Sequence, residues 1–231
     1  MTQQSLLTNR IEEVQERVAA ACGRAGRSPA DVQLIAVTKY VSLESTGQVL
    51  DAGLTHIGEN RWQDAAPKWE AFGNRGTWHF IGHLQTNKVK DVVGRFAYIH
   101  SLDRLSLAKE IEKKASALGI VVPCFLQLNV SGEESKYGME PEALLPFVKE
   151  LRSMSSIKVE GLMTMAPYES EPEETRPVFR ALREWRDRLN EAAVLDYEVH
   201  GLSMGMSNDF EVAIEEGATW VRLGSVLVGK E

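Results

Sequence analysis

The chain has 231 residues, 43% of them hydrophobic, which is enough to bury one sizeable core within a single domain. Its 33 acidic and 26 basic residues give a formal net charge of -7, which disfavours nucleic acid or an anionic membrane as the main partner and favours a small ligand. Since no apolar run reaches membrane-spanning length, we expect no transmembrane segment.

The chain opens with a segment of helical periodicity at residues 5–25, which the string GRAGRSP ends. The apolar side chains that recur at helical spacing there are Leu6, Ile11, Val14, Val18 and Ala21. Acidic residues in this segment interrupt the continuous apolar core that a signal peptide needs. We therefore expect an amphipathic helix and a cytoplasmic protein.

Strand and helix patterns then alternate to the end of the chain. The first strand pattern, QLIAVTKY at residues 33–40, is the apolar, β-branched kind found in parallel strands buried on both faces. Further strands are predicted at 55–59, 78–82, 96–100, 121–130, 157–166, 197–205 and 219–229. Helices are predicted at 43–53, through Trp62 and Trp69, and at 85–94, 102–118, 141–154, 172–189 and 207–217.

About eight strands alternating with helices predict an α/β fold, a (β/α)8 TIM barrel with one extra helix in front. An open, doubly wound sheet is the alternative. We expect residues 1–231 to form one domain, with an amino-terminal helix within residues 1–30 packed outside the barrel.

Polar residues at the strand ends are the candidates for a binding site, because ligands of such barrels lie at the carboxyl ends of the strands. They are Lys39, Glu59, Asn60, His79, His83, Ser101, Asn129, Thr164, Ser203, Arg222 and Ser225. Lys39 ends the first strand, where partial loss of hydration can lower the pKa of its amine and free it to attack an aldehyde. The alternative is that Lys39 extends into solvent.

Glycine and serine cluster at the last two strand ends. Gly224 directly precedes Ser225, and Gly205 lies two residues before Ser207 at the predicted start of a helix. Free backbone N–H groups in the loops after the seventh and eighth strands are the usual phosphate site of these barrels. The alternative is that these glycines serve tight turns.

Arg222 lies inside the apolar string TWVRLG, where a charge needs an acid or a polar ligand. Facing the barrel interior, it could donate a hydrogen bond to a heteroaromatic nitrogen; a salt bridge to a glutamate is the alternative.

His79 and His83 lack a third metal ligand at suitable spacing, so structural or ligand-lining roles are favoured. Cys22 and Cys124 lack the paired spacing of a disulfide framework or a metal site. Hydrolase and nucleotide-triphosphate motifs are absent from the sequence.

Seven strings spread over nearly the whole chain resemble the YggS/PROSC family of pyridoxal 5'-phosphate (PLP) homeostasis proteins. They are LIAVTKY, HIGENRWQD, WHFIGHLQTNK, LNVSGEESKYG, GLMTMAP, HGLSMGMSNDF and VRLGSVLVG. The resemblance implies a fold type III PLP barrel, like the amino-terminal domain of alanine racemase. Two departures are Ser225, where the family often has threonine, and Trp62, where valine is common.

The resemblance also implies a role for each matching residue. Lys39 would hold PLP as a Schiff base, Asn60 would line the cofactor, and Arg222 would face the pyridine nitrogen. The residues expected to hold the phosphate are Ser203, Ser207, Gly224 and Ser225. Lys136 matches a further family lysine with an accessory role, and no metal is expected.

The implied function is to hold PLP reversibly and to deliver it to apo-enzymes rather than to catalyse a reaction. We expect a monomer, because no additional domain or obvious apolar patch in the sequence offers an interface. An arginine beside the pyridine nitrogen keeps that nitrogen unprotonated and weakens the cofactor as an electron sink. A small PLP-dependent amino-acid racemase is the alternative within the family, although no second acid or base is evident opposite Lys39. A Schiff-base aldolase acting on a phosphosugar is a third possibility.

Overall fold

The computed structural model of the chain describes residues 3–133, 137–167 and 170–229. In that part of the chain, eight parallel strands pair in sequence order and β1 closes the ring against β8. The strands are β1 (Gln33–Val37), β2 (His56–Glu59), β3 (Thr77–Phe80), β4 (Tyr98–Leu102), β5 (Val122–Gln127), β6 (Ile157–Met163), β7 (Gly201–Ser203) and β8 (Trp220–Leu223). The predicted (β/α)8 barrel is confirmed, and the alternative of an open sheet is wrong.

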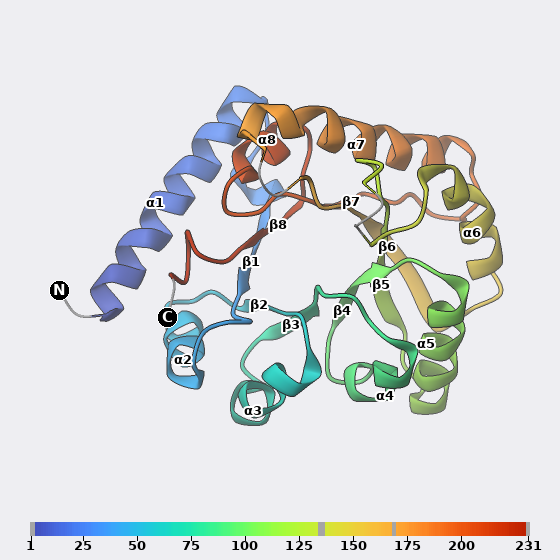
Figure 1. Cartoon of the computed structure of the whole chain (residues 1–231), viewed down its shortest axis with the longest axis horizontal. Coiled ribbons are helices and arrows are strands. Elements are labelled where there is room, and N and C mark those ends of the chain that lie inside the picture. The colour runs from blue at the N-terminus through green and yellow to red at the C-terminus, as the bar shows by residue number, and fades with distance from the viewer. Residues whose placement is uncertain (1–2, 134–136, 168–169, 230–231) are drawn as a thin grey trace.

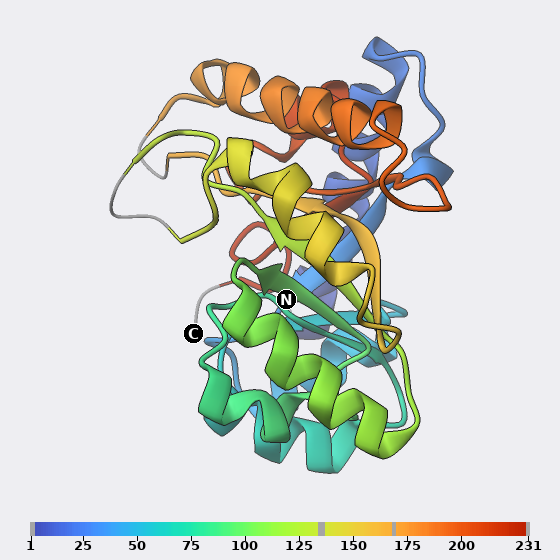
Figure 2. The same cartoon turned by 90° about the vertical axis from the view of Figure 1, so that its right-hand side faces the viewer.

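Helices alternate with the strands and surround them (Figure 1). They are α1 (Gln3–Arg24), α2 (Leu43–Asp51), α3 (Trp62–Phe72), α4 (Val89–Val92), α5 (Leu105–Leu118), α6 (Leu144–Leu151), α7 (Arg176–Glu191) and α8 (Phe210–Glu215). Figure 2 shows α7, in orange, and α5, in green, on opposite sides of the strands. Within the described ranges, no helix combines the length and apolar character needed to cross a membrane.

The strands are short and buried on both faces, as the apolar runs predict. In β1, the consecutive residues Ile35 and Ala36 are both fully buried, although neighbouring side chains of a strand point to opposite faces. One face packs against the surrounding helices and the other fills the barrel interior. The register that pairs Ile35 with Arg222 and Ala36 with Leu223 brings the ends of β1 and β8 to the same level.

The eighth helix begins later than predicted. The sequence pattern places its start at Ser207, whereas α8 begins at Phe210. The carboxylate of Asp209 accepts a hydrogen bond from the backbone N–H of Met206 at 2.6 Å, which folds residues 206–209 into a turn before the helix. Ser207 therefore lies in a turn between β7 and α8.

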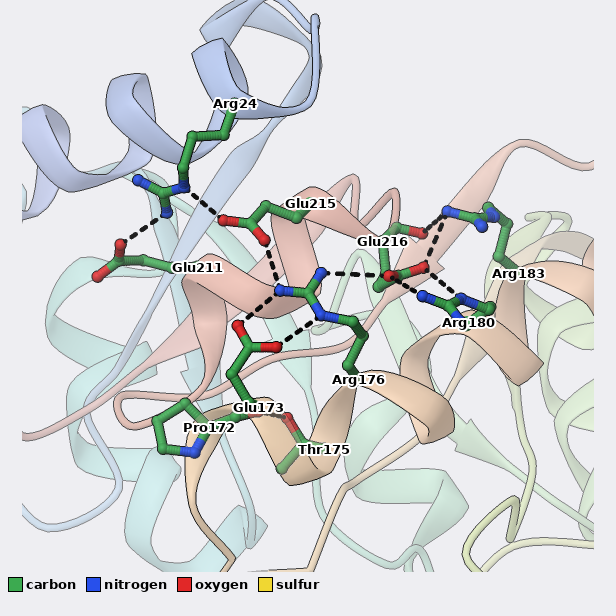
Figure 3. A network of polar contacts seen from close by, with 10 residues as sticks. All are labelled: Arg24, Pro172, Glu173, Thr175, Arg176, Arg180, Arg183, Glu211, Glu215 and Glu216. Atoms are coloured by element: carbon green, nitrogen blue, oxygen red, sulfur yellow. Dashed lines mark hydrogen bonds and ion pairs between the residues drawn. The ribbon is translucent and has the colours of Figure 1, made fainter.

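The amino-terminal helix α1 lies outside the barrel against α8 (Figure 1). Charged side chains join α1, α7 and α8 in what we call the arginine network: Arg24, Arg176, Arg180 and Arg183 with Glu173, Glu211, Glu215 and Glu216 (Figure 3). At its centre, Arg176 lies 2.7 Å from both Glu173 Oε1 and Glu215 Oε2, and 3.2 Å from Glu216 Oε1. The network holds α8, and with it the turn that carries Ser207, against its neighbours.

Candidate functional site

A cavity of about 1170 Å³ opens at the carboxyl ends of the strands. Six of the seven residues predicted to bind the cofactor line it: Lys39, Asn60, Ser207, Arg222, Gly224 and Ser225. They come from the ends of β1, β2 and β8 and from the turn after β7. The closed barrel brings these distant segments together because all its parallel strands end on one side.

Lys39 lies in the turn that follows β1, is partly buried and lines the cavity. Its Nζ lies 4.9 Å from the centre of the Tyr40 ring, a distance at which an ammonium group is attracted to the ring face. Tyr40 itself is 82% exposed. The amine therefore stands at the mouth of the cavity, where a soluble aldehyde can reach it.

A buried ion pair fixes the backbone immediately before Lys39. Lys68 of α3 donates to the carbonyl oxygen of Thr38 at 2.5 Å and to Glu59 Oε1 at 2.9 Å. The Thr38 hydroxyl donates to the same Glu59 oxygen at 2.6 Å, and the Glu59 side chain is fully buried. We call Thr38, Glu59 and Lys68 the β1 anchor, since it joins the ends of β1 and β2 to α3.

Arg222 is almost fully buried and is held by two neutral acceptors. It donates to Ser203 Oγ at 2.7 Å and to the carbonyl oxygen of Thr164 at 2.9 Å. Burial lowers the pKa of Arg222 to about 10, and the nearby Asp209 opposes this shift, so the guanidinium is charged at neutral pH. Among the described residues, no carboxylate lies within 4 Å of it as a salt-bridge partner. A buried cation held only by neutral groups fits a site with room for another acceptor, as the polar-ligand prediction requires.

Backbone N–H groups converge on Ser207 at the other side of the cavity. The N–H groups of Gly224 and Val226 donate to Ser207 Oγ at 3.2 and 3.4 Å. A Cβ added at Gly224 would meet only Val37, at 3.8 Å, so packing of the protein does not require glycine there. We call these amides, the hydroxyl and the neighbouring Ser225 the cradle. Its N–H groups donate to Ser207 Oγ in this structure, and an anion such as a phosphate group would take the place of that hydroxyl as their acceptor.

Gly205, in contrast, serves the turn. Its φ is +92°, and an added Cβ would lie 2.6 Å from the Ala213 side chain. The tight-turn alternative therefore applies to Gly205, whereas the surroundings of Gly224 leave space beside its backbone.

The structure does not bring Ser203 to the cavity wall with the other predicted phosphate ligands. Its side chain is fully buried, and its hydroxyl lies between Arg222 and His100, 2.8 Å from His100 Nδ1. β4 and β7 are not neighbours in the barrel, so this contact crosses the barrel interior. The side chain of Ser203 thus faces the interior, where these two groups engage its hydroxyl.

The other strand-end candidates divide between the cavity and the interior. His83 lines the cavity and stacks on Tyr137 at 4.0 Å, whereas His79 is fully buried within the barrel. Thr164 contributes the carbonyl oxygen that Arg222 contacts. Lys136 lies outside the described residues. Among the described residues, no group of three or more histidine, cysteine or acidic side chains could hold a metal ion.

Two contributors to the site were missed by sequence reasoning. Asp209 is buried at the cavity wall, where burial raises the pKa of its carboxyl although the Met206 N–H opposes the shift. The signal that could have found it is an aspartate directly before an apolar helical pattern, a common helix start. Lys68 offered no such signal, because a lysine within an amphipathic helix is usually solvated.

Comparisons with known proteins identify the family of the chain. The family model for the alanine racemase amino-terminal domain matches residues 11–231. A pyridoxal phosphate homeostasis protein of Aquifex aeolicus is 47% identical over 224 residues, covering 96% of both chains.

Solved structures of similar chains give the same result. A protein of unknown function from Bifidobacterium adolescentis has a TM-score of 0.91 and 34% identity, covering 97% of this chain and 95% of that one. PipY of Synechococcus elongatus, with PLP bound, has a TM-score of 0.81 and 35% identity over 94% of this chain and 100% of its own. The chain belongs to the alanine racemase amino-terminal domain family and, within it, to the family of pyridoxal phosphate homeostasis proteins.

Proposed function

We propose that this protein binds PLP in the cavity, holds it as a Schiff base on Lys39, and serves PLP homeostasis in the cell. The observation that carries the proposal is one cavity lined by an accessible amine, a cradle of backbone amides and a buried guanidinium that has no carboxylate partner among the described residues. The names of the curated relatives and the PLP bound to PipY support it.

Each part of the cavity suits one part of PLP. When bound, PLP supplies a reactive aldehyde and an electron-withdrawing ring. Lys39 provides the amine for the aldehyde, and Ser207, Gly224 and Ser225 provide the hydroxyls and N–H groups for the phosphate. Arg222 is a hydrogen-bond donor only, so it can face the ring nitrogen only while that nitrogen carries no proton.

We propose a carrier rather than a catalyst. An unprotonated ring nitrogen stabilises carbanions weakly, which disfavours racemisation. A racemase would need an acid and a base on opposite faces of the cofactor, and Lys39 supplies one of them. Incubation of the loaded protein with amino acids in deuterated water tests this proposal: we expect no exchange of the α-hydrogen, and exchange at catalytic rates would favour the racemase.

Delivery to apo-enzymes by a cytoplasmic monomer is the finer part of the proposal. The open mouth of the cavity supports it, since Tyr40 is 82% and Tyr137 is 55% exposed there. The loaded protein and free PLP are each mixed with the apo-form of a PLP enzyme in a buffer that scavenges free PLP. We expect the loaded protein to restore the activity of that enzyme faster than free PLP does. Equal rates would contradict direct delivery, and light scattering would test the monomer.

The direct test is the absorbance spectrum of the purified protein incubated with PLP, followed by borohydride reduction and peptide mapping. We expect a visible band that borohydride removes, with the added mass on the peptide that carries Lys39. Lys39→Arg should abolish both, because its guanidinium keeps the charge without a nucleophilic amine. The exposed Lys109→Ala of α5 is the matched control and should behave as the parent protein. A colourless parent protein would refute the proposal and favour a phosphosugar aldolase.

A further inference from the structure

A row of hydrogen-bonded side chains crosses the barrel interior from its amino-terminal end towards the cavity. His56 starts β2, and its Nδ1 lies 3.0 Å from Nε2 of His79 on β3. His79 Nδ1 lies 2.9 Å from Nε2 of His100 on β4. His100 Nδ1 lies 2.8 Å from the Oγ of Ser203, which in turn contacts Arg222. We call His56, His79 and His100 the histidine row.

The row is buried except at its start. His56 is partly exposed and packs edge-on against Trp220 at 4.9 Å, whereas His79, His100 and Ser203 are fully buried. Burial lowers the pKa of His79 and of His100 well below the ordinary value, and the neighbouring imidazoles and Arg222 lower it further. Both rings are therefore neutral at neutral pH, each with one N–H donor and one acceptor nitrogen.

Counting donors and acceptors fixes the direction of the hydrogen bonds. Arg222 has only donors, so Ser203 Oγ accepts from it. Among the described residues, the only other partner of that hydroxyl is His100. The hydroxyl must donate to His100 Nδ1, because the opposite direction would leave its hydrogen buried without an acceptor. His100 Nε2–H then donates to His79 Nδ1, and His79 Nε2–H donates to His56 Nδ1.

We propose that the histidine row is a set of positioning residues for Arg222. By holding the hydroxyl of Ser203 as a donor towards His100, the row turns the oxygen lone pairs towards the guanidinium. Arg222 is thereby fixed between Ser203 and the Thr164 carbonyl at the cavity wall, and its remaining side-chain donors have no other partner among the described residues. The consequence for PLP rests on the proposed function, whereas the direction of the hydrogen bonds does not.

The hydrogen-bond direction can be measured without PLP. In protein carrying ¹⁵N-labelled histidine, NMR at pH 7.5 should find His79 and His100 as neutral Nε2–H tautomers, with signals assigned by single substitutions. An Nδ1–H tautomer or a doubly protonated ring at His100 would overturn the proposal, because Ser203 could then no longer be the donor.

Three substitutions of His100 test the positioning role. Asparagine places its amide near the position of Nδ1 and can still accept from Ser203, glutamine places it nearer Nε2, and leucine offers no polar atom. We expect His100→Asn to bind PLP with an affinity close to that of the parent protein. His100→Gln and His100→Leu should bind about tenfold more weakly, as expected when a hydrogen bond to a charged group is disturbed. Equal affinity in all three variants would overturn the proposal.

A matched control separates weaker PLP binding that comes from a less stable protein from weaker binding that comes from a displaced Arg222. Phe179→Leu changes a fully buried side chain of α7 outside the barrel, and it should lower the free energy of unfolding without weakening PLP binding. If the parent protein fails to bind PLP, the proposed function is refuted. The tautomers of His79 and His100 would then still test the proposed direction of the hydrogen bonds.

Discussion

The buried pair in the β1 anchor allows a quantitative prediction. Lys68→Met would remove the two hydrogen bonds that Lys68 donates, to Thr38 and to Glu59. Glu59 is fully buried, and one of its oxygens, Oε2, already has no hydrogen-bond partner among the described residues. The remaining charge would keep only the Thr38 hydroxyl. Breaking a buried ion pair in this way costs about 3–5 kcal/mol of unfolding free energy.

For a chain of this size, that loss corresponds to a fall in Tm of roughly 6–20 °C. Urea unfolding and calorimetry of the protein without PLP would measure it. Adding Glu59→Gln to Lys68→Met removes the uncompensated charge and should restore more than half of the loss. The partly exposed pair of Lys158 and Glu160 is the control, and Lys158→Met should cost less than about 1 kcal/mol. A loss below about 1 kcal/mol for Lys68→Met, or a double variant less stable than the single one, would refute the reasoning.

Three further predictions follow from the cavity, the arginine network and the interior. Gly224→Ala should change the free energy of unfolding by no more than about 0.5 kcal/mol, yet weaken PLP binding about tenfold in a titration. Gly205→Ala should lower the free energy of unfolding, measured in urea, by about 2 kcal/mol or more. The reverse order would show that the cradle is misassigned. Arg176→Ala should cost about 1–2 kcal/mol at low salt and less in 1 M salt, and a salt-independent difference would contradict an ionic role. Burial lowers the pKa of His79 and His100, so the unfolded chain binds protons that the folded chain does not. With respect to these two histidines, the free energy of unfolding is highest above about pH 6.5. It decreases by about 1 kcal/mol per pH unit for each histidine as the pH falls from there towards the folded-state pKa values. Urea unfolding at several pH values measures this slope, and a flat profile between pH 7.5 and 5.5 would contradict it.

The cavity could be predicted because few residues can stand at the ends of parallel strands. Once Lys39 ends one apolar run and Arg222 interrupts another, a barrel forces them onto the same side. Their neighbourhood depends on closure, since β1 and β8 are the first and last strands and pair only when the ring closes. An open sheet with the same strands would have separated them.

The positions that prediction missed depend on packing between elements. Ser203 ends its strand as expected, but the direction of its side chain depends on how β7 pairs with its neighbours. His79 was expected at its strand end, but its partners His56 and His100 lie on other strands, and the assembled barrel brings the three rings together. Lys68 is buried only because α3 docks where β1 and β2 end. Such contacts follow from the assembled fold rather than from any local pattern.

The seam between the first and last strands has a consequence for protein synthesis. Lys39 follows β1, whereas Arg222, Gly224 and Ser225 lie on or directly after β8, which leaves the ribosome after the other seven strands. A nascent chain that has not yet reached β8 lacks both the closing strand and the cavity residues Arg222, Gly224 and Ser225. The binding site therefore forms only after β8 has been synthesised, and a chain interrupted before β8 would lack a complete site for a reactive aldehyde.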